Sequence, residues 1–205
     1  MCIRDSSSAD GVVGRQAARR LGRAVEVRVL ASSGGLIADV LADQLPRVPA
    51  DAQVVFVSVG ANDATHLTGL DTFTSSYREL LAGMPATACV VVLGVPDIGS
   101  AFRLAQPLRA VAGWRGRSVD GRVRQLAQDS GATFVDIAGA TGPAFRRDRS
   151  LFSPDGYHPN DAGYALWAGA VTSALGGPAA WAALGQSDPA PGQSDTIPAL
   201  GRVCR

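Results

Sequence analysis

The chain has 205 residues, of which 46% are hydrophobic and 18% charged, and its formal net charge is +1. This length and composition predict one globular domain, and the near-neutral charge excludes a global attraction to nucleic acid or to an anionic membrane. The apolar runs are too short to span a bilayer, so we expect no stable membrane insertion.

Short apolar runs rich in β-branched residues alternate with segments of helical character. The runs are nearly continuous, which is typical of strands covered on both faces. We expect strands at residues 25–30, 54–59, 89–93 and 133–137. We expect helices at residues 14–21, 36–45, 73–81, 119–130 and 161–175, the last capped by Asn160 or Asp161. The alternation predicts an α/β fold in which a parallel sheet has helices on both sides.

The composition changes after residue 176. Residues 177–205 are rich in Pro, Gly and Ser and repeat Gln-Ser-Asp, a composition that cannot bury enough apolar surface to fold. We therefore expect one domain over residues 7–176 and a disordered tail over residues 177–205.

Two residue types need separate interpretation. All 19 basic residues are arginines, and we interpret their cluster between Arg103 and Arg124 as a solvated helix face. The three cysteines, Cys2, Cys89 and Cys204, do not form a recognisable framework, so we expect no structural disulfide.

Polar and glycine-rich loops follow the expected strands. Ser33-Gly34-Gly35 follows the first strand, Gly60-Ala61-Asn62-Asp63 the second, and Pro96-Asp97 the third. In a parallel sheet such loops meet at the carboxyl edge, where ligands bind. The segment from Gly99 to Arg117 is expected to form a lid over that edge.

An aspartate three residues before a histidine suggests catalysis. Asp155 can accept the Nδ1 proton of His158 and leave Nε2 facing a nucleophile, although Pro, Asp and Gly also form turns without any catalytic role. Asn62 can donate to an oxyanion, or it can cap its own backbone in an Asx turn. The backbone N–H of Gly34 is a second candidate donor, or Gly34 is a plain turn glycine. The serine of such a site must come from the start of the chain.

The four segments together resemble the SGNH hydrolases, also called the GDSL esterases and lipases. Gly60-Ala61-Asn62-Asp63 and Asp155-Gly156-Tyr157-His158 match two of that family's blocks completely, and Gly34 matches the glycine block. The resemblance implies a three-layer, flavodoxin-like α/β/α sandwich and carboxylic ester hydrolysis through an acyl-enzyme, without metal or cofactor. It implies Ser7 as nucleophile, His158 as proton carrier and Asp155 as its orienting partner. The oxyanion hole would then consist of the Ser7 and Gly34 N–H groups and the Asn62 side chain.

The first block departs from the family pattern. Ser7 has the family's spacing to Gly11 but follows Ser6, whereas Ser6 follows Asp5 but lies one residue too far from Gly11. We choose Ser7 and leave Ser6 open. Too few residues precede either serine for a strand, so we expect the first strand to be missing and residues 1–6 not to be native sequence. As written, the chain predicts a cytoplasmic protein, and a lost upstream export signal stays open.

Alternative functions use the same residues. The domain could bind a ligand without catalysis after losing its nucleophile block, or it could transfer the acyl group to an alcohol. We expect a monomer that acts on a small-molecule, glycan or lipid ester with a short acyl or acetyl group. His66, the second histidine, is interpreted as a surface residue.

Overall fold

Three parallel strands form the central sheet of the part of the chain that the structure describes. The computed structural model describes residues 27–176. The strands β1 (Val54–Val57), β2 (Cys89–Leu93) and β3 (Thr133–Val135) lie in the order β1-β2-β3. Their register pairs Val54 with Cys89 and Val91 with Thr133.

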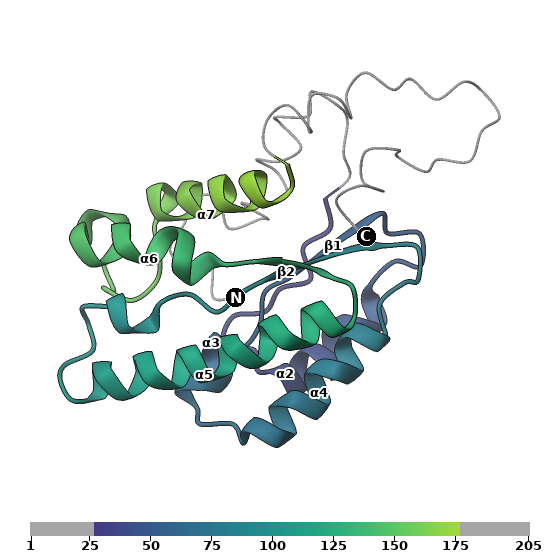
Figure 1. The fold of residues 1–205 in the computed structure, drawn as a ribbon, viewed down its shortest axis with the longest axis horizontal. Helices are drawn as coiled ribbons and strands as arrows, with labels where there is room; N and C mark the ends of the chain where they lie inside the picture. Colours follow the sequence, from purple (N-terminus) through teal and green to yellow (C-terminus); the bar gives the residue numbers. More distant parts are fainter. Residues whose placement is uncertain (1–26, 177–205) are drawn as a thin grey trace.

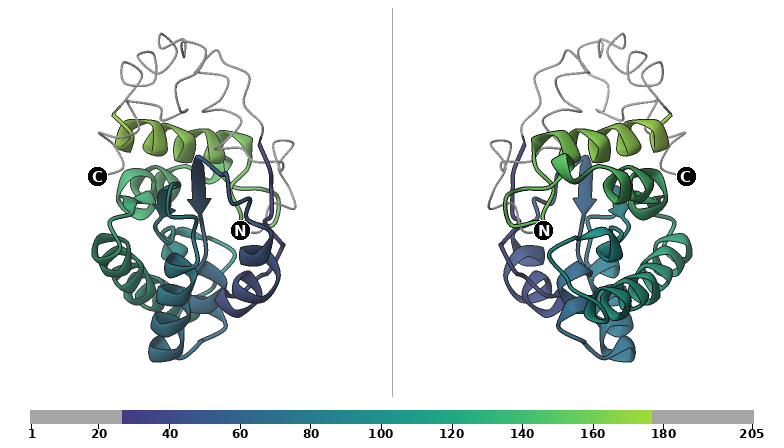
Figure 2. Two further views of the ribbon diagram at one scale, coloured as in Figure 1. Left: turned by 90° about the vertical axis from the view of Figure 1, so that its right-hand side faces the viewer. Right: turned by 90° about the vertical axis from the view of Figure 1, so that its left-hand side faces the viewer.

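Helices cover both faces of this sheet, as Figures 1 and 2 show. One face carries α6 (Ile137–Arg147) and α7 (Asp161–Ala174), and the other carries α2 (Ile37–Asp39), α4 (Leu70–Ala82) and α5 (Leu108–Asp129). The short elements are α3 (Ala61–Thr65), the π-helical turn η1 (Val40–Gln44) and the 3-10 turns η2 (Leu45–Arg47), η3 (Ile98–Ser100) and η4 (Arg149–Leu151). The predicted α/β/α arrangement is confirmed.

The alternation of side chains along β2 explains why this strand is apolar throughout. Val91 and Leu93 pack in the core under α6 and α7, whereas Val92 packs in the core under α4 and α5. All three are at most 2% exposed. A strand covered on both faces cannot alternate apolar with polar residues, so the continuous run was the correct signal for its position.

Local chemistry sets the start of α7. The Asn160 side chain accepts a hydrogen bond from the Gly163 N–H at 3.1 Å, which confirms this residue as the predicted N-cap. Because α7 begins directly after the loop that holds Asp155 and His158, the cap also fixes where that loop ends.

Several expected boundaries were wrong. Residues 27–30 of the expected first strand are not in a strand, and Val29 is 40% exposed. A strand exists only where its backbone finds a neighbouring strand, and in the described residues no ladder reaches this segment. The expected lid is in part helical, because α5 begins at Leu108 and not near Val119. The helix α6 was not expected at all.

Cys89 also corrects the sequence interpretation. It is buried and takes part in a disulfide, so the expectation of no disulfide was wrong. The partner lies outside the described residues. Disulfide partners are brought together by the fold, and cysteine spacing does not reveal them. In residues 27–176, no helix combines the length and apolarity that crossing a membrane requires.

Candidate active site

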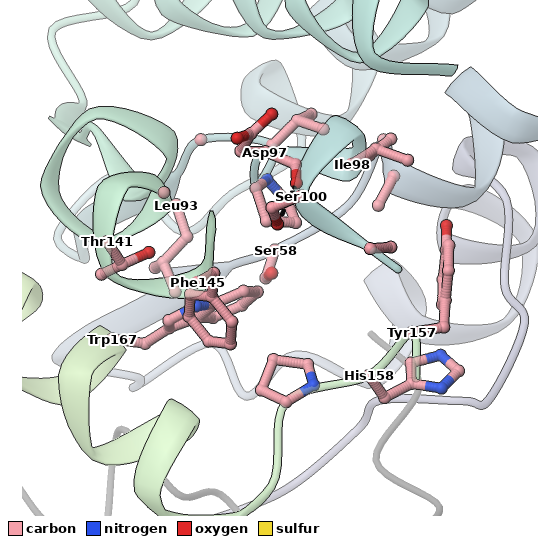
Figure 3. Close-up of a pocket in the computed structure, with 18 of the residues that line it drawn as sticks. Ser58, Leu93, Asp97, Ile98, Ser100, Thr141, Phe145, Tyr157, His158 and Trp167 are labelled. Carbon is pink, nitrogen blue, oxygen red and sulfur yellow. Dashed lines mark hydrogen bonds between the residues drawn. The ribbon is translucent and has the colours of Figure 1, made fainter. Parts of the chain in front are cut away.

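A cavity lies at the carboxyl ends of β1 and β2, where the fold predicts a ligand site. The loops after both strands line it, together with residues from α6, α7 and the loop before α7. Figure 3 shows Phe145 and Trp167 on one side of this cavity and Tyr157 and His158 on the other. Asn62 and His158, predicted from segments far apart in the sequence, line the same cavity.

The Asp155 and His158 side chains form a direct hydrogen bond. His158 Nδ1 lies 2.5 Å from Asp155 Oδ2, and both side chains are about a quarter exposed, at 25% and 23%. A carboxylate at this position accepts the Nδ1 proton, which leaves Nε2 with a free lone pair in the neutral ring. Within residues 27–176, Nε2 has no hydrogen-bond partner.

The backbone of the same loop holds Asp155 in place. Its other oxygen, Oδ1, accepts the N–H groups of Tyr157 at 2.8 Å and of His158 at 2.9 Å. Gly156 adopts a φ of 67°, which lets the chain turn back between the carboxylate and the imidazole. The loop is closed by a hydrogen bond from the Ser153 N–H to the His158 carbonyl at 2.7 Å.

These contacts decide the charge of Asp155. Partial burial raises the pKa of the Asp155 carboxyl, but the two backbone N–H groups and the imidazole of His158 together lower it more. The net direction is a pKa below the ordinary value for aspartate. The carboxylate is therefore ionised at neutral pH, as a partner that orients a histidine must be.

Asn62 connects two of the predicted loops. Its side-chain amide donates to the Gly35 carbonyl at 3.0 Å, across 27 residues of sequence. This contact differs from the Asx turn that was the alternative interpretation. Because an amide nitrogen has two hydrogens, one N–H of Asn62 stays available to a ligand in the cavity.

Glycine makes the turn that presents Asn62. Gly60 has a φ of 121° and is the N-cap of α3, so the chain leaves β1 sharply and Asn62 falls in the first turn of the short helix. A Cβ at Gly60 would lie within 3.2 Å of the Phe73, Val95 and Val119 side chains. Both the conformation and the space favour glycine.

The next residue, Asp63, has a structural role and does not carry a proton in the reaction. It is fully buried, and its carboxylate accepts the Ile37 N–H at 3.1 and 3.3 Å, which ties α3 to the start of α2. Burial raises the pKa of Asp63, and hydrogen bonds from Thr68 and Ile37 offset part of that rise.

The proposed nucleophile lies outside the described residues. Ser7 and Ser6 both precede residue 27, so their roles remain predictions. Gly34 has a φ of 77° and does not line the cavity, whereas its neighbour Gly35 does. The role of the Gly34 N–H therefore also remains a prediction.

Other hydroxyl groups reach the cavity but are already bonded. Ser100 donates to the Asp97 carbonyl at 2.7 Å, and Thr141 donates to the Ile137 carbonyl at 2.7 Å. Ser58 also lines the cavity and has an interaction partner. None of the described hydroxyls donates to His158, so the serine of the motif has no rival among these residues.

The second histidine has a structural partner. The exposed ring of His66 lies with Nδ1 2.9 Å from the Asn62 carbonyl. Among residues 27–176, no group of three or more histidine, cysteine or carboxylate side chains is placed to hold a metal ion.

The walls of the cavity were not identified from sequence. Phe145 comes from α6, and Tyr164 and Trp167 come from α7. Asp97, expected to shape the rim, is held by the Arg146 guanidinium at 2.6 Å. An amphipathic interpretation of residues 137–147 could have placed Phe145 on the sheet-facing side of a helix, but the internal Pro143 obscured the pattern.

Comparison with known proteins identifies the family of the chain. Residues 4–166 match the model of the GDSL-like lipase/acylhydrolase family. A GDSL-like esterase of Mycobacterium tuberculosis is 32% identical over 162 residues, which are 78% of this chain and 51% of that protein. The chain thus spans about half the length of this curated relative.

Solved structures share the fold. A phospholipase A1 from Streptomyces albidoflavus superposes with a TM-score of 0.58 at 22% identity, over 70% of this chain and 78% of that one. An acetyl xylan esterase from Geobacillus stearothermophilus superposes with a TM-score of 0.59 at 22% identity, over 79% and 78% of the two chains. The flavodoxin-like fold implied by the resemblance is thereby confirmed.

Proposed function

Because the chain belongs to the GDSL-like lipase/acylhydrolase family, we propose that it hydrolyses carboxylic esters through an acyl-enzyme intermediate. One observation carries the proposal. His158, bonded to Asp155 at 2.5 Å, lines the same cavity as Asn62, whose amide has a second N–H that is not bonded to Gly35. A proton carrier and an oxyanion donor at one cavity are what acyl transfer requires.

In the proposed reaction, the Ser7 hydroxyl attacks the ester carbonyl while His158 Nε2 takes its proton. Collapse of the tetrahedral intermediate expels the alcohol, which receives that proton from His158. Water then repeats both steps on the acyl-serine and releases the acid. Asp155 stays ionised throughout and stabilises the imidazolium that forms after each proton transfer.

The proposed oxyanion hole contains Asn62 and the N–H groups of Ser7 and Gly34. The bond from Asn62 to the Gly35 carbonyl supports the first assignment, because it fixes the amide before substrate binds. A donor that is already oriented costs no reorganisation during the reaction.

Labelling with a fluorophosphonate tests whether a serine is activated. We expect one modified serine, and peptide mapping should place it at Ser7, with Ser6 as the open alternative. Modification of Ser58 or Ser100 would contradict the assigned nucleophile. A folded chain that takes no label would support the non-catalytic alternative instead.

Turnover of p-nitrophenyl butyrate tests the other groups. Asn62→Ala should lower kcat by about a hundred- to a thousandfold, the usual cost of one oxyanion donor. The matched control is Ser100→Ala, which lies on the same cavity but bonds only backbone. Asp155→Asn should reduce kcat strongly, because an amide at this position favours the wrong imidazole tautomer. Equal activity of Asn62→Ala and the control would remove Asn62 from the mechanism.

The acyl group of the substrate is proposed to be short, with acetyl as the simplest case. Support comes from the large side chains of Phe145 and Trp167, which face His158 across the cavity (Figure 3). A series of p-nitrophenyl esters from acetate to decanoate should show kcat/KM falling as the chain lengthens. A maximum at the long esters would contradict this part of the proposal alone.

A further inference from the structure

An apolar stripe is exposed along the first turns of α5. Leu108 is 59% exposed, Val111 48% and Trp114 60%. Their spacing of three residues places them along one side of the helix, each beside the next. An exposed tryptophan flanked by aliphatic residues is uncommon on a monomer and marks an interaction site.

A neighbouring loop adds to this stripe. Leu67, 66% exposed, follows α3 and has a φ of 58°. The next residue, Thr68, accepts a hydrogen bond through its carbonyl from the Arg115 guanidinium, which ties the loop to α5. We call Leu67, Leu108, Val111 and Trp114 together the α5 patch.

The charged residues of the segment that carries most of the α5 patch have one sign. Residues 98–119 contain four arginines and neither aspartate nor glutamate, although the whole chain has a net charge of only +1. These arginines are Arg103, Arg109, Arg115 and Arg117. The first acidic residue beyond them, Asp120, turns inward and accepts the Val95 N–H at 2.8 Å. Arg122, two residues after Asp120 in α5, is exposed and adds a further positive charge.

The combination of exposed apolar side chains and nearby arginines distinguishes between two possible partners, a second copy of the chain and a lipid surface. Two copies meeting through this patch would bring arginine against arginine, and residues 98–119 hold no carboxylate to neutralise them. An anionic phospholipid surface supplies both requirements at once, because its headgroups attract arginine and its acyl boundary takes up tryptophan and leucine. We propose that the α5 patch binds the surface of an anionic phospholipid bilayer.

Binding there would bring the cavity close to the lipid. The start of α5 is bonded to the segment before it, since Arg109 donates to the Leu104 carbonyl at 2.8 Å and to the Phe102 carbonyl at 3.0 Å. That segment in turn contacts the loop of the Asp155 and His158 pair, through the Arg103 N–H and the Gly156 carbonyl at 3.1 Å. In Figure 1, α5 begins at the same end of the molecule as the loop after β2.

Flotation with vesicles tests the proposal without relying on ester hydrolysis. The full chain should float with vesicles of phosphatidylcholine mixed with phosphatidylglycerol and stay behind with phosphatidylcholine alone. Val111→Asp combined with Trp114→Asp should reduce the bound fraction about tenfold or more, because each change removes apolar contact and adds repulsion. Arg117→Gln with Arg122→Gln should weaken binding in the same direction, and added salt should do so as well.

The matched control is Leu166→Asp, which places the same charge at a residue 38% exposed on α7, in the opposite layer. It should bind vesicles as the unchanged chain does. Circular dichroism and gel filtration accompany each variant. Absence of binding by the unchanged chain, or equal binding by the Val111 and Trp114 variant, would overturn the proposal. A dimer that dissociates in that variant, without vesicle binding, would assign the patch to a second copy and also overturn it.

Discussion

Gly60→Ala should destabilise the fold strongly, although it adds only one methyl group. The new Cβ would lie 3.1 Å from a Val119 methyl and 3.2 Å from side-chain carbons of Phe73 and Val95. Overpacking of this kind costs about 1 to 3 kcal/mol. The φ of 121° adds backbone strain, typically about 1 to 3 kcal/mol for a side-chain-bearing residue. We expect the free energy of unfolding to fall by about 2 to 6 kcal/mol.

Urea denaturation followed by circular dichroism measures this loss, and Gly121→Ala is the matched control. Gly121 lies in α5, with no atom within 4 Å of an added Cβ. Alanine there should stabilise the helix by up to about 1 kcal/mol. Equal urea midpoints for the two variants would refute the reasoning, because they would show that neither the contacts nor the φ of Gly60 constrains the turn.

Three further predictions concern charge and packing. Burial raises the pKa of Asp63, so its contribution to stability is full below its unfolded pKa of about 4 and is lost as pH rises through the folded pKa. In urea titrations, the free energy of unfolding of Asp63→Asn should therefore rise relative to that of the unchanged chain as pH goes from acid to neutral. A difference between the two chains that does not change with pH would contradict this. Phe145→Ala removes a ring that is 5% exposed and packs edge-on against Phe152, with ring centroids 5.0 Å apart. Calorimetry should show that the free energy of unfolding falls by about 3 kcal/mol, and a fall well below about 1 kcal/mol would refute this. Arg146→Ala leaves the Asp97 side chain, only 8% exposed, without its guanidinium partner, and should cost about 1 kcal/mol by thermal unfolding, whereas Arg147→Ala should cost less.

The loops of the site could be predicted because strand order is enough to place them. Asn62 follows β1, and parallel strands end at a common edge, so a sequence interpretation can bring it near other loops without knowing any side-chain contact. His158 needed only the short spacing to Asp155. Their meeting at one cavity was thus predictable, but the bond from Asn62 to the Gly35 carbonyl was not, because it depends on the path of a loop with no regular structure.

The helices α5 and α6 show what the sequence could not provide. α5 contains Gly113 and Gly116, which weaken any helix signal, yet these glycines allow the helix to approach Gly99 and Ile98 closely. α6 contains Pro143 and is capped by Asp136, which accepts the Gly139 N–H at 2.7 Å. In both cases packing against the rest of the fold outweighs local propensity.

Neighbouring residues Asn62 and Asp63 reach the same short segment, one through the Gly35 carbonyl and the other through the Ile37 N–H. Two hydrogen bonds of opposite direction therefore join the two loops. Asn62 donates one to the loop before α2, and Asp63 accepts the other from it. Anyone grafting this half of the site onto a different scaffold would have to transplant both loops as a unit. Without the second loop, the turn at residues 60–63 would lose the Gly35 carbonyl that orients the Asn62 amide.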